Sequence, residues 1–173
     1  NDNKIYFSSH GPRGGDHIGE VQFGSNYGWK DIAWGGREYY GLGIGDAPFK
    51  DKYKKPLISW VPSMGISSIQ FYAGKTFPEW QGDLLVASLN GQSLIRLDLE
   101  NSKIIAKEII FKDKIGRIRD FKIDYNGDIL TCSHDWGKDM IMGNLNDNTI
   151  YEIWTGKKFG IARKNLLNAK NIQ

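Results

Sequence analysis

The stretch that decides the fold is Asp83-Leu-Leu-Val-Ala-Ser-Leu89, followed by Asn90-Gly91 and then by Ser93-Leu-Ile-Arg-Leu-Asp-Leu99. The first segment is a compact apolar run, which is typical of a buried strand. The last segment alternates apolar and polar residues, as a half-buried strand does. Because Asn-Gly between two such runs is a strong hairpin signal, the stretch predicts a β-hairpin with its turn at Asn90-Gly91.

The pattern continues on the C-terminal side of this hairpin. Turns are predicted at Asn101-Ser102 and Asn126-Gly127, strands over 104–111, 117–123, 129–132 and 149–154, and a helical turn near 162–167. Consecutive short strands joined by tight turns give antiparallel meanders. A sandwich, a barrel and a propeller all fit such a pattern.

A weak internal repeat favours the propeller. Gly82-Asp-Leu-Leu85 and Gly127-Asp-Ile-Leu130 are similar strand starts, and Asp83 and Asp128 lie 45 residues apart. This spacing is the size of one four-stranded propeller blade.

The N-terminal side of the hairpin is rich in glycine. Between Ser8 and Asp46 there are 11 glycines, so a long helix is not expected there. Glycine is used where the backbone bends sharply or approaches a ligand closely. Large aromatic residues in the same segment argue against a flexible linker: Trp29, Trp34, Tyr39 and Tyr40.

Composition excludes several classes of protein. The hydrophobic fraction is 40% and the charged fraction is 25%, which is unlike a disordered or a membrane-spanning chain. The net charge of +3 comes from scattered basic residues, which does not favour nucleic acid as a partner. Cys132 is the one cysteine and cannot form an internal disulfide. Because the chain begins at Asn1, we expect it to be part of a longer protein.

Several segments, in this order, resemble the glucose/sorbosone dehydrogenase family of six-bladed β-propellers. They are His10-Gly-Pro-Arg-Gly-Gly-Asp16, Gly24-Ser-Asn-Tyr-Gly-Trp29, Trp60-Val-Pro-Ser63, Phe77-Pro-Glu-Trp-Gln-Gly-Asp-Leu84 and Gly116-Arg-Ile-Arg-Asp120. The resemblance implies an all-β chain, residues 1–173 forming a single domain. That domain would be the C-terminal half of the propeller, with about three antiparallel blades.

The resemblance also implies a function. Family members are soluble dehydrogenases that use pyrroloquinoline quinone (PQQ) and Ca²⁺ to oxidise an aldose at C1 to the lactone. The expected location is the periplasm or outside the cell, and the expected partners are an aldose and an unspecified electron acceptor.

The metal site implied by the resemblance is Gly11-Pro12, whose backbone carbonyls would face Ca²⁺. Calcium takes oxygen ligands, including backbone carbonyls. Asp16 is close enough in sequence to support this site. Taken alone, Gly-Pro-Arg-Gly-Gly is more often simply a tight turn.

Four positions are implied as contacts of the cofactor: Ser63, Asn90, Arg117 and Arg119. The two arginines lie two apart on a predicted strand and would face the same side, where paired guanidinium groups suit a polycarboxylate. The alternative is a surface pair bound to Asp113 or Asp120. Asn90 stands where some relatives carry a Lys, which removes one cation from the cofactor's surroundings.

Trp60 is implied as a substrate contact, because an aromatic face suits the apolar side of a sugar ring. A Trp packed in the core is the alternative. An acidic residue of the family aligns with either His134 or Asp135.

The family's general base lies upstream of this chain, so no catalytic residue is assigned here. His10, His17 and His134 do not have the spacing of a zinc site. We therefore expect the chain alone to be inactive, and either to need the missing half or to self-associate. Two alternatives are a non-catalytic propeller of the same superfamily that binds a protein or glycan, and an unrelated lectin-like β domain.

Overall fold

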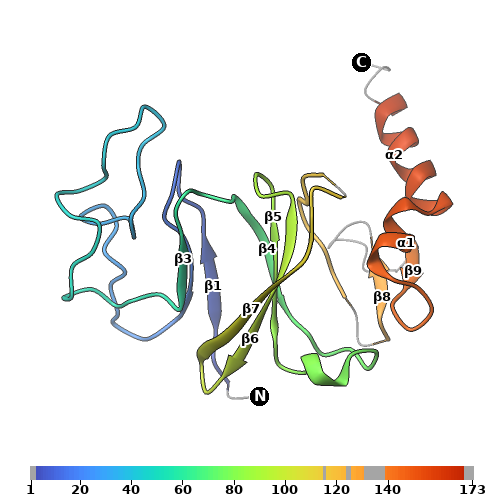
Figure 1. The fold of residues 1–173 in the computed structure, drawn as a ribbon, viewed down its shortest axis with the longest axis horizontal. Coiled ribbons are helices and arrows are strands. Elements are labelled where there is room, and N and C mark those ends of the chain that lie inside the picture. Colours follow the sequence, from blue (N-terminus) through green and yellow to red (C-terminus); the bar gives the residue numbers. More distant parts are fainter. Residues whose placement is uncertain (1–2, 115, 124–125, 131–138, 170–173) are drawn as a thin grey trace. The chain divides into compact units, whose positions relative to one another are not determined.

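The computed structural model describes residues 3–114, 116–123, 126–130 and 139–169. The chain divides into two compact units: Asn1–Ile69 with Leu84–Arg119, and Gln70–Asp83 with Asp120–Gln173. Each unit is described by itself, and the single-domain interpretation stays a prediction. Figure 1 shows the strands and the two C-terminal helices along the sequence.

The first sheet combines two strands near the N-terminus with one beyond the glycine-rich segment, and no strand was predicted from the sequence at these positions. Its antiparallel strands run in the order β1 (Tyr6–Ser9), β2 (Asp16–Glu20) and β3 (Ile58–Trp60). The pairing of Asp16 with Trp60 joins segments that are far apart in sequence.

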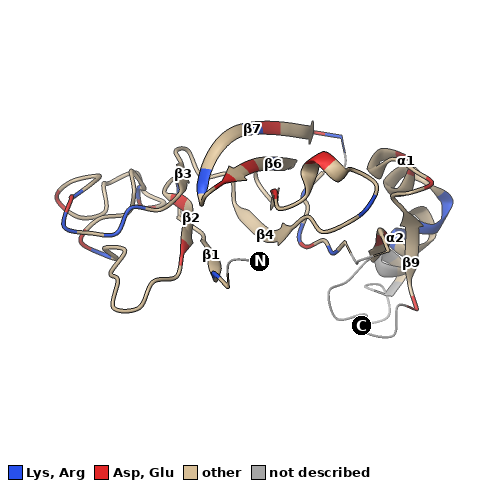
Figure 2. Cartoon of the chain, turned by 90° about the horizontal axis from the view of Figure 1, so that it is seen from below, with Lys and Arg blue, Asp and Glu red and all other residues tan. Residues whose placement is uncertain are grey.

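A long loop connects β2 to β3, and ion pairs hold part of it. The Asp31 carboxylate accepts a 2.5 Å hydrogen bond from the Tyr53 hydroxyl and pairs with Lys50 and Lys52. Lys50, Tyr53 and Lys52 together hold the pKa of Asp31 well below its usual range. Figure 2 shows positive and negative residues interspersed in this loop, so its charges are paired rather than gathered by sign.

The second sheet is the hairpin region predicted from the sequence. Its four strands lie in the order β4 (Ile66–Phe71), β5 (Leu84–Ser88), β6 (Ser93–Glu100) and β7 (Lys103–Lys112). β5, β6 and β7 match the predicted strands within two residues, whereas β4 was missed.

The two predicted turns of this sheet are confirmed in position. Asn101 and Ser102 both have positive φ, of 49° and 59°, and they form a two-residue turn between β6 and β7. The first turn is longer. It runs from Leu89 to Gln92, and Gln92 rather than Gly91 takes the positive φ.

The core of the first unit comes from both of its sheets. Ile18 of β2 packs with Met64 and with side chains from β4, β5 and β6. The buried members of this cluster are Ile18, Met64, Ile66, Leu84, Val86, Ile95 and Leu97. Burial of each large aliphatic side chain contributes about 1.5–3 kcal/mol. This shared core holds β2 against the hairpin region and so fixes the segments that carry the candidate site.

The second unit contains a short antiparallel pair, β8 (Asp128–Leu130) with β9 (Ile141–Asn144), and a 3₁₀ turn, η1 (Pro78–Trp80). The predicted turn at Asn126-Gly127 precedes β8, and Gly127 has a φ of 85°. The predicted strand over 117–123 is wrong, because only an isolated bridge joins Ile123 to Ile129. Of the predicted strand 129–132, the last two residues lie outside the described residues.

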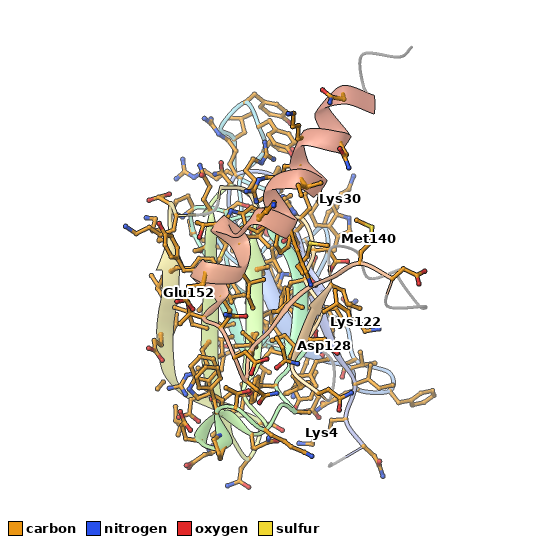
Figure 3. All side chains as sticks on the ribbon, turned by 90° about the vertical axis from the view of Figure 1, so that its right-hand side faces the viewer. Lys4, Lys30, Lys122, Asp128, Met140 and Glu152 are labelled. Carbon is orange, nitrogen blue, oxygen red and sulfur yellow. The ribbon has the colours of Figure 1, made fainter. Side chains whose placement is uncertain are left out.

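The predicted last strand, 149–154, is also wrong. These residues begin α1 (Ile150–Thr155), which is followed by α2 (Lys157–Ala169). A capping box starts α1: the Thr149 hydroxyl accepts from the Glu152 amide at 3.2 Å, and the Glu152 carboxylate accepts from the Thr149 amide at 2.8 Å. Figure 3 shows Glu152 at the start of this helix. The predicted helical turn near 162–167 is part of a longer helix.

Three antiparallel sheets confirm the prediction of an all-β fold with about three blades. The two terminal helices are the departure from it.

Candidate cofactor-binding site

Asp16, the first residue of β2, is a fully buried carboxylate with four hydrogen-bond donors around it. Its Oδ1 accepts from the Gly11 amide at 2.7 Å and from the Ser63 hydroxyl at 2.6 Å. Its Oδ2 accepts from the amides of Gly65 at 2.6 Å and Ile66 at 3.2 Å. One side chain therefore joins the Gly11 loop to the segment that leads into β4.

Backbone hydrogen bonds place these two segments side by side before any side chain is considered. The Gly15 amide donates to the Trp60 carbonyl at 2.8 Å, and the Ser63 amide donates to the Arg13 carbonyl at 3.1 Å. The predicted metal pair Gly11-Pro12 and the predicted cofactor contact Ser63 are thus brought together, although about 50 residues separate them in sequence.

The Gly11-Pro12 loop is tight and leaves its carbonyls available. A Cβ on Gly11 would lie 2.0 Å from the Gly14 carbonyl oxygen, so this position needs glycine. Within the part of the chain that the structure describes, no donor hydrogen-bonds to the carbonyl oxygen of Gly11 or Pro12. Two adjacent, partly buried carbonyls without donors fit the oxygen ligands that calcium prefers.

Asn90 lies next to Ser63. Its backbone amide donates to the Met64 carbonyl at 2.9 Å, and its side-chain amide is 3.5 Å from the Ser63 carbonyl oxygen, at the limit of a hydrogen bond. The Asn90 side chain is exposed, so its amide protons remain accessible beside Ser63.

Arg117 and Arg119 flank a residue that is anchored to the hairpin sheet. Ile118 is buried, its amide donates to the Ser88 carbonyl at 3.3 Å, and its carbonyl accepts from the Ser67 hydroxyl at 2.6 Å. Ser67 is near the start of β4 and Ser88 ends β5, so Ile118 lies at the end of the sheet that also carries Gly65 and Asn90.

Both arginine side chains are exposed. Among the described residues neither guanidinium forms an ion pair with Asp113 or Asp120. That they converge with Gly11 and Ser63 on one ligand stays a prediction.

Trp60 is half-buried and packs against the core cluster of the first unit. This is the packing role that the sequence left open as the alternative. Its predicted contact with substrate remains untested.

The structure adds an open hollow beside the Gly11-Pro12 pair. It has a volume of about 600 Å³ including space open to solvent, and its lining includes His10, Pro12 and the 72%-exposed Trp29. Trp29 ends one of the quoted motifs, yet the sequence alone did not assign it a role, because exposure of a single Trp depends on long-range packing.

The comparisons with known proteins agree with this arrangement. Residues 1–142 match the model of the Glucose / Sorbosone dehydrogenase family. The chain belongs to the glucose/sorbosone dehydrogenase family.

Among curated proteins, aldose sugar dehydrogenase YliI of Escherichia coli (strain K12) is 33% identical over 127 residues, covering 72% of this chain and 34% of the relative. The uncharacterized protein slr1608 of Synechocystis sp. (strain ATCC 27184 / PCC 6803 / Kazusa) is 32% identical over 129 residues, covering 73% of this chain and 30% of the relative. The chain therefore spans about a third of the length of these relatives.

Solved structures show the same likeness. A glucose dehydrogenase is 35% identical with a TM-score of 0.68, covering 74% of this chain and 37% of its own. The soluble aldose sugar dehydrogenase of Escherichia coli in its apo-form is 30% identical with a TM-score of 0.64, covering 73% and 37%. The PQQ-bound aldose sugar dehydrogenase of Streptomyces coelicolor is 21% identical with a TM-score of 0.53, covering 73% of this chain and 33% of its own. At this identity the comparison shows a similar fold. These likenesses confirm the predicted family and its propeller fold class.

A second model, described as an iron-sulfur cluster-binding domain, matches residues 116–172. Iron-sulfur clusters are commonly held by four cysteine thiolates. The chain has one cysteine, Cys132, which lies outside the described residues together with His134 and Asp135. The residues of this chain do not fit an iron-sulfur cluster, and no chemistry is derived through one.

Two further searches of the described residues constrain the site. No group of three or more His, Cys, Asp or Glu side chains there could hold a metal ion. No described helix has the length and apolar character to cross a membrane.

Proposed function

We propose that this chain is part of a PQQ- and calcium-dependent dehydrogenase that oxidises an aldose at C1 to the lactone. The observation that carries the proposal is the Gly11-Pro12 loop, whose carbonyls accept from no donor of the described residues and which Asp16 ties to Ser63. Because the chain covers about a third of its relatives, the activity belongs to the whole protein.

The Gly11 and Pro12 carbonyls would hold Ca²⁺, and Asn90, Arg117 and Arg119 would hold the quinone. When bound, the quinone would supply a hydride acceptor and Ca²⁺ would supply a Lewis acid, while the residues of this chain would hold both groups in place. The same quinone is present in the solved Streptomyces relative.

The role of the two arginines is to bind carboxylates. Each guanidinium offers a planar fork of donors, and neither fork is occupied by an acidic residue of the described chain. Asn90 offers a neutral hydrogen-bond donor at a position where the Lys of some relatives would bind a cofactor carboxylate more strongly. Arg117 and Arg119 therefore carry most of the positive charge toward a tricarboxylate at this end of the sheet.

Ser63 contributes differently from the prediction of a direct donor. Its hydroxyl donates to Asp16 and accepts from the Gly65 amide at 3.2 Å. A hydrogen bond from Ser63 to a cofactor carboxylate would require the hydroxyl to rotate away from Asp16. Ser63 thus supports the proposal mainly as a link between the metal loop and β4.

The general base that removes the sugar hydroxyl proton is assigned to the part of the protein upstream of this chain. His10 lies beside the Gly11-Pro12 loop and lines the hollow, but its position gives no reason to make it the base. The chain alone is therefore expected not to oxidise sugar. A periplasmic or secreted location and an aldose partner are parts of the same proposal.

The test of this function is quinone binding by paired arginine variants. In the presence of Ca²⁺, Arg117→Ala/Arg119→Ala should bind PQQ about 100-fold or more weakly than the wild type, because each hydrogen bond between charged groups is worth about 1.5–3 kcal/mol. The matched control is Arg37→Ala/Lys103→Ala, which removes two exposed charges elsewhere. Spectroscopic titration gives both affinities. Equal loss in the two double variants would show non-specific attraction and contradict the proposal.

A non-catalytic glycan-binding propeller is the second candidate. Two observations favour it: Asn90 replaces a cation, and the exposed Trp29 offers an aromatic face at an open hollow. Glycan binding without quinone binding would support it over the dehydrogenase.

A further inference from the structure

The buried carboxylate of Asp16 is surrounded by uncharged hydrogen-bond donors in the described part of the chain. It is 0% exposed and accepts four hydrogen bonds from uncharged donors. No Lys, Arg or His of the described residues forms an ion pair with it. Removal of a carboxylate from water is unfavourable unless its charge is compensated, and hydrogen bonds alone compensate it in part.

A cation at the Gly11-Pro12 loop is a candidate for compensation. Asp16 Oδ1 is 2.7 Å from the Gly11 amide, and the free carbonyls of Gly11 and Pro12 follow within two residues. A negative charge in a water-poor interior attracts a nearby cation more strongly than the same charge at the surface. The charge of Asp16 and the oxygens of the loop therefore favour the same ion.

The same side chain also sets geometry. Its Oδ1 joins the two segments by accepting from Gly11 and Ser63, and its Oδ2 accepts from Gly65 and Ile66 at the start of β4. An Asn at this position would offer one acceptor oxygen and one NH₂ group. Because an NH₂ group cannot accept from an amide, either the loop side or the β4 side must lose its contacts.

We propose that Asp16 is a positioning residue that fixes the Gly11-Pro12 loop against Ser63 and whose buried charge raises the affinity of that loop for a divalent cation. This inference rests on the proposed function for the presence of the cation. It assigns to Asp16 no contact with the metal and no contact with the substrate.

The test compares Asp16→Asn with Ser93→Ala in the complete 173-residue chain. Ser93 is buried in β6 and shares a 3.0 Å hydrogen bond with Ser88, so its variant also loses a buried hydrogen bond but does not touch the loop. Three quantities are measured: calcium affinity by calorimetry, exchange of the Gly11, Gly65 and Ile66 amide hydrogens, and the thermal midpoint.

The expected result is a calcium affinity at least tenfold lower in Asp16→Asn and unchanged in Ser93→Ala. Exchange should become faster at Gly11, or at both Gly65 and Ile66, beyond what the change in thermal midpoint explains. Equal calcium affinity in wild type and Asp16→Asn would overturn the proposal while leaving the proposed function intact.

Two other outcomes are also informative. If the wild type binds no calcium, the proposed function and the charge effect both fail, whereas faster exchange in Asp16→Asn still supports the positioning effect. If Asp16→Asn does not fold, Ser63→Ala takes its place, since it keeps the charge and three of the four donors. We expect Ser63→Ala to speed amide exchange at Gly11 and to lower calcium affinity by less than tenfold. If both quantities stayed unchanged, the positioning effect would be overturned.

Discussion

Single side chains hold the candidate site together through contacts that no local pattern contains. Gly11, Pro12, Ser63 and Asn90 were implied by the family resemblance, and the structure places Gly11, Ser63 and Asn90 around one small region. The four hydrogen bonds that Asp16 accepts were not predictable, because three of the donors lie 47–50 residues away in sequence. A sequence motif identifies which residues matter, but it does not show which acceptor they share.

Trp60 offers a test of packing against substrate contact. Trp60→Ala should lower the free energy of unfolding by about 2 kcal/mol, because the half-buried ring packs on the core. Trp29→Ala is the control and should change stability by no more than about 0.5 kcal/mol, since Trp29 is 72% exposed. Urea denaturation measures both. If Trp60→Ala were as stable as Trp29→Ala, the packing role of Trp60 would be contradicted and its ring would be available for contact with substrate.

Strands with a strong local pattern were predicted well, and elements held by distant partners were not. β5, β6 and β7 have alternating or apolar runs and tight turns, so their ends could be read within two residues. β1, β2 and β3 are only three to five residues long, and β2 and β3 pair across a long loop. Their pairing comes from tertiary contacts such as those of Asp16.

α1 was mistaken for a strand because Ile150, Ile153 and Trp154 were taken as a β pattern. Their spacing of three and four residues is helical, and Thr149 with Glu152 forms a capping box that was readable in the sequence. The hydrogen bonds from Thr149 also lower the pKa of Glu152.

The capping box gives a prediction at this scale. Thr149→Ala should destabilise α1 by about 1 kcal/mol, because the Glu152 amide loses its acceptor. The matched control is Thr155→Ala at the end of the same helix, which should leave α1 as stable or slightly more stable because Ala is the better helix former. Hydrogen exchange at the Ile153 amide reports the difference. Equal exchange in the two variants would mean that the box does not stabilise the helix.

The whole chain combines a family match over residues 1–142 with a second match over 116–172. The two matches overlap at the segment that carries Arg117 and Arg119. The donor set decides against the chemistry of the second match, since the chain holds a single thiol.

Anaerobic reconstitution of the 173-residue chain with iron and sulfide should therefore give no stoichiometric cluster after desalting. Visible absorption and iron content are the measurements, and Cys132→Ser is the control that should behave like the wild type. A cluster retained by the wild type and lost in Cys132→Ser would show that copies of this chain can supply the missing ligands.

At the scale of the whole molecule, the central proposal is that this chain provides residues that bind the calcium ion and the quinone of a dehydrogenase. The most direct measurement is PQQ binding by the purified 173-residue chain, titrated once with Ca²⁺ and once with a chelator. We expect saturable binding with Ca²⁺ that the chelator weakens at least tenfold, because the Gly11-Pro12 carbonyls would hold the ion and its positive charge would favour a polycarboxylate. Binding that is equally tight with the chelator, or absent under both conditions, would contradict the claim.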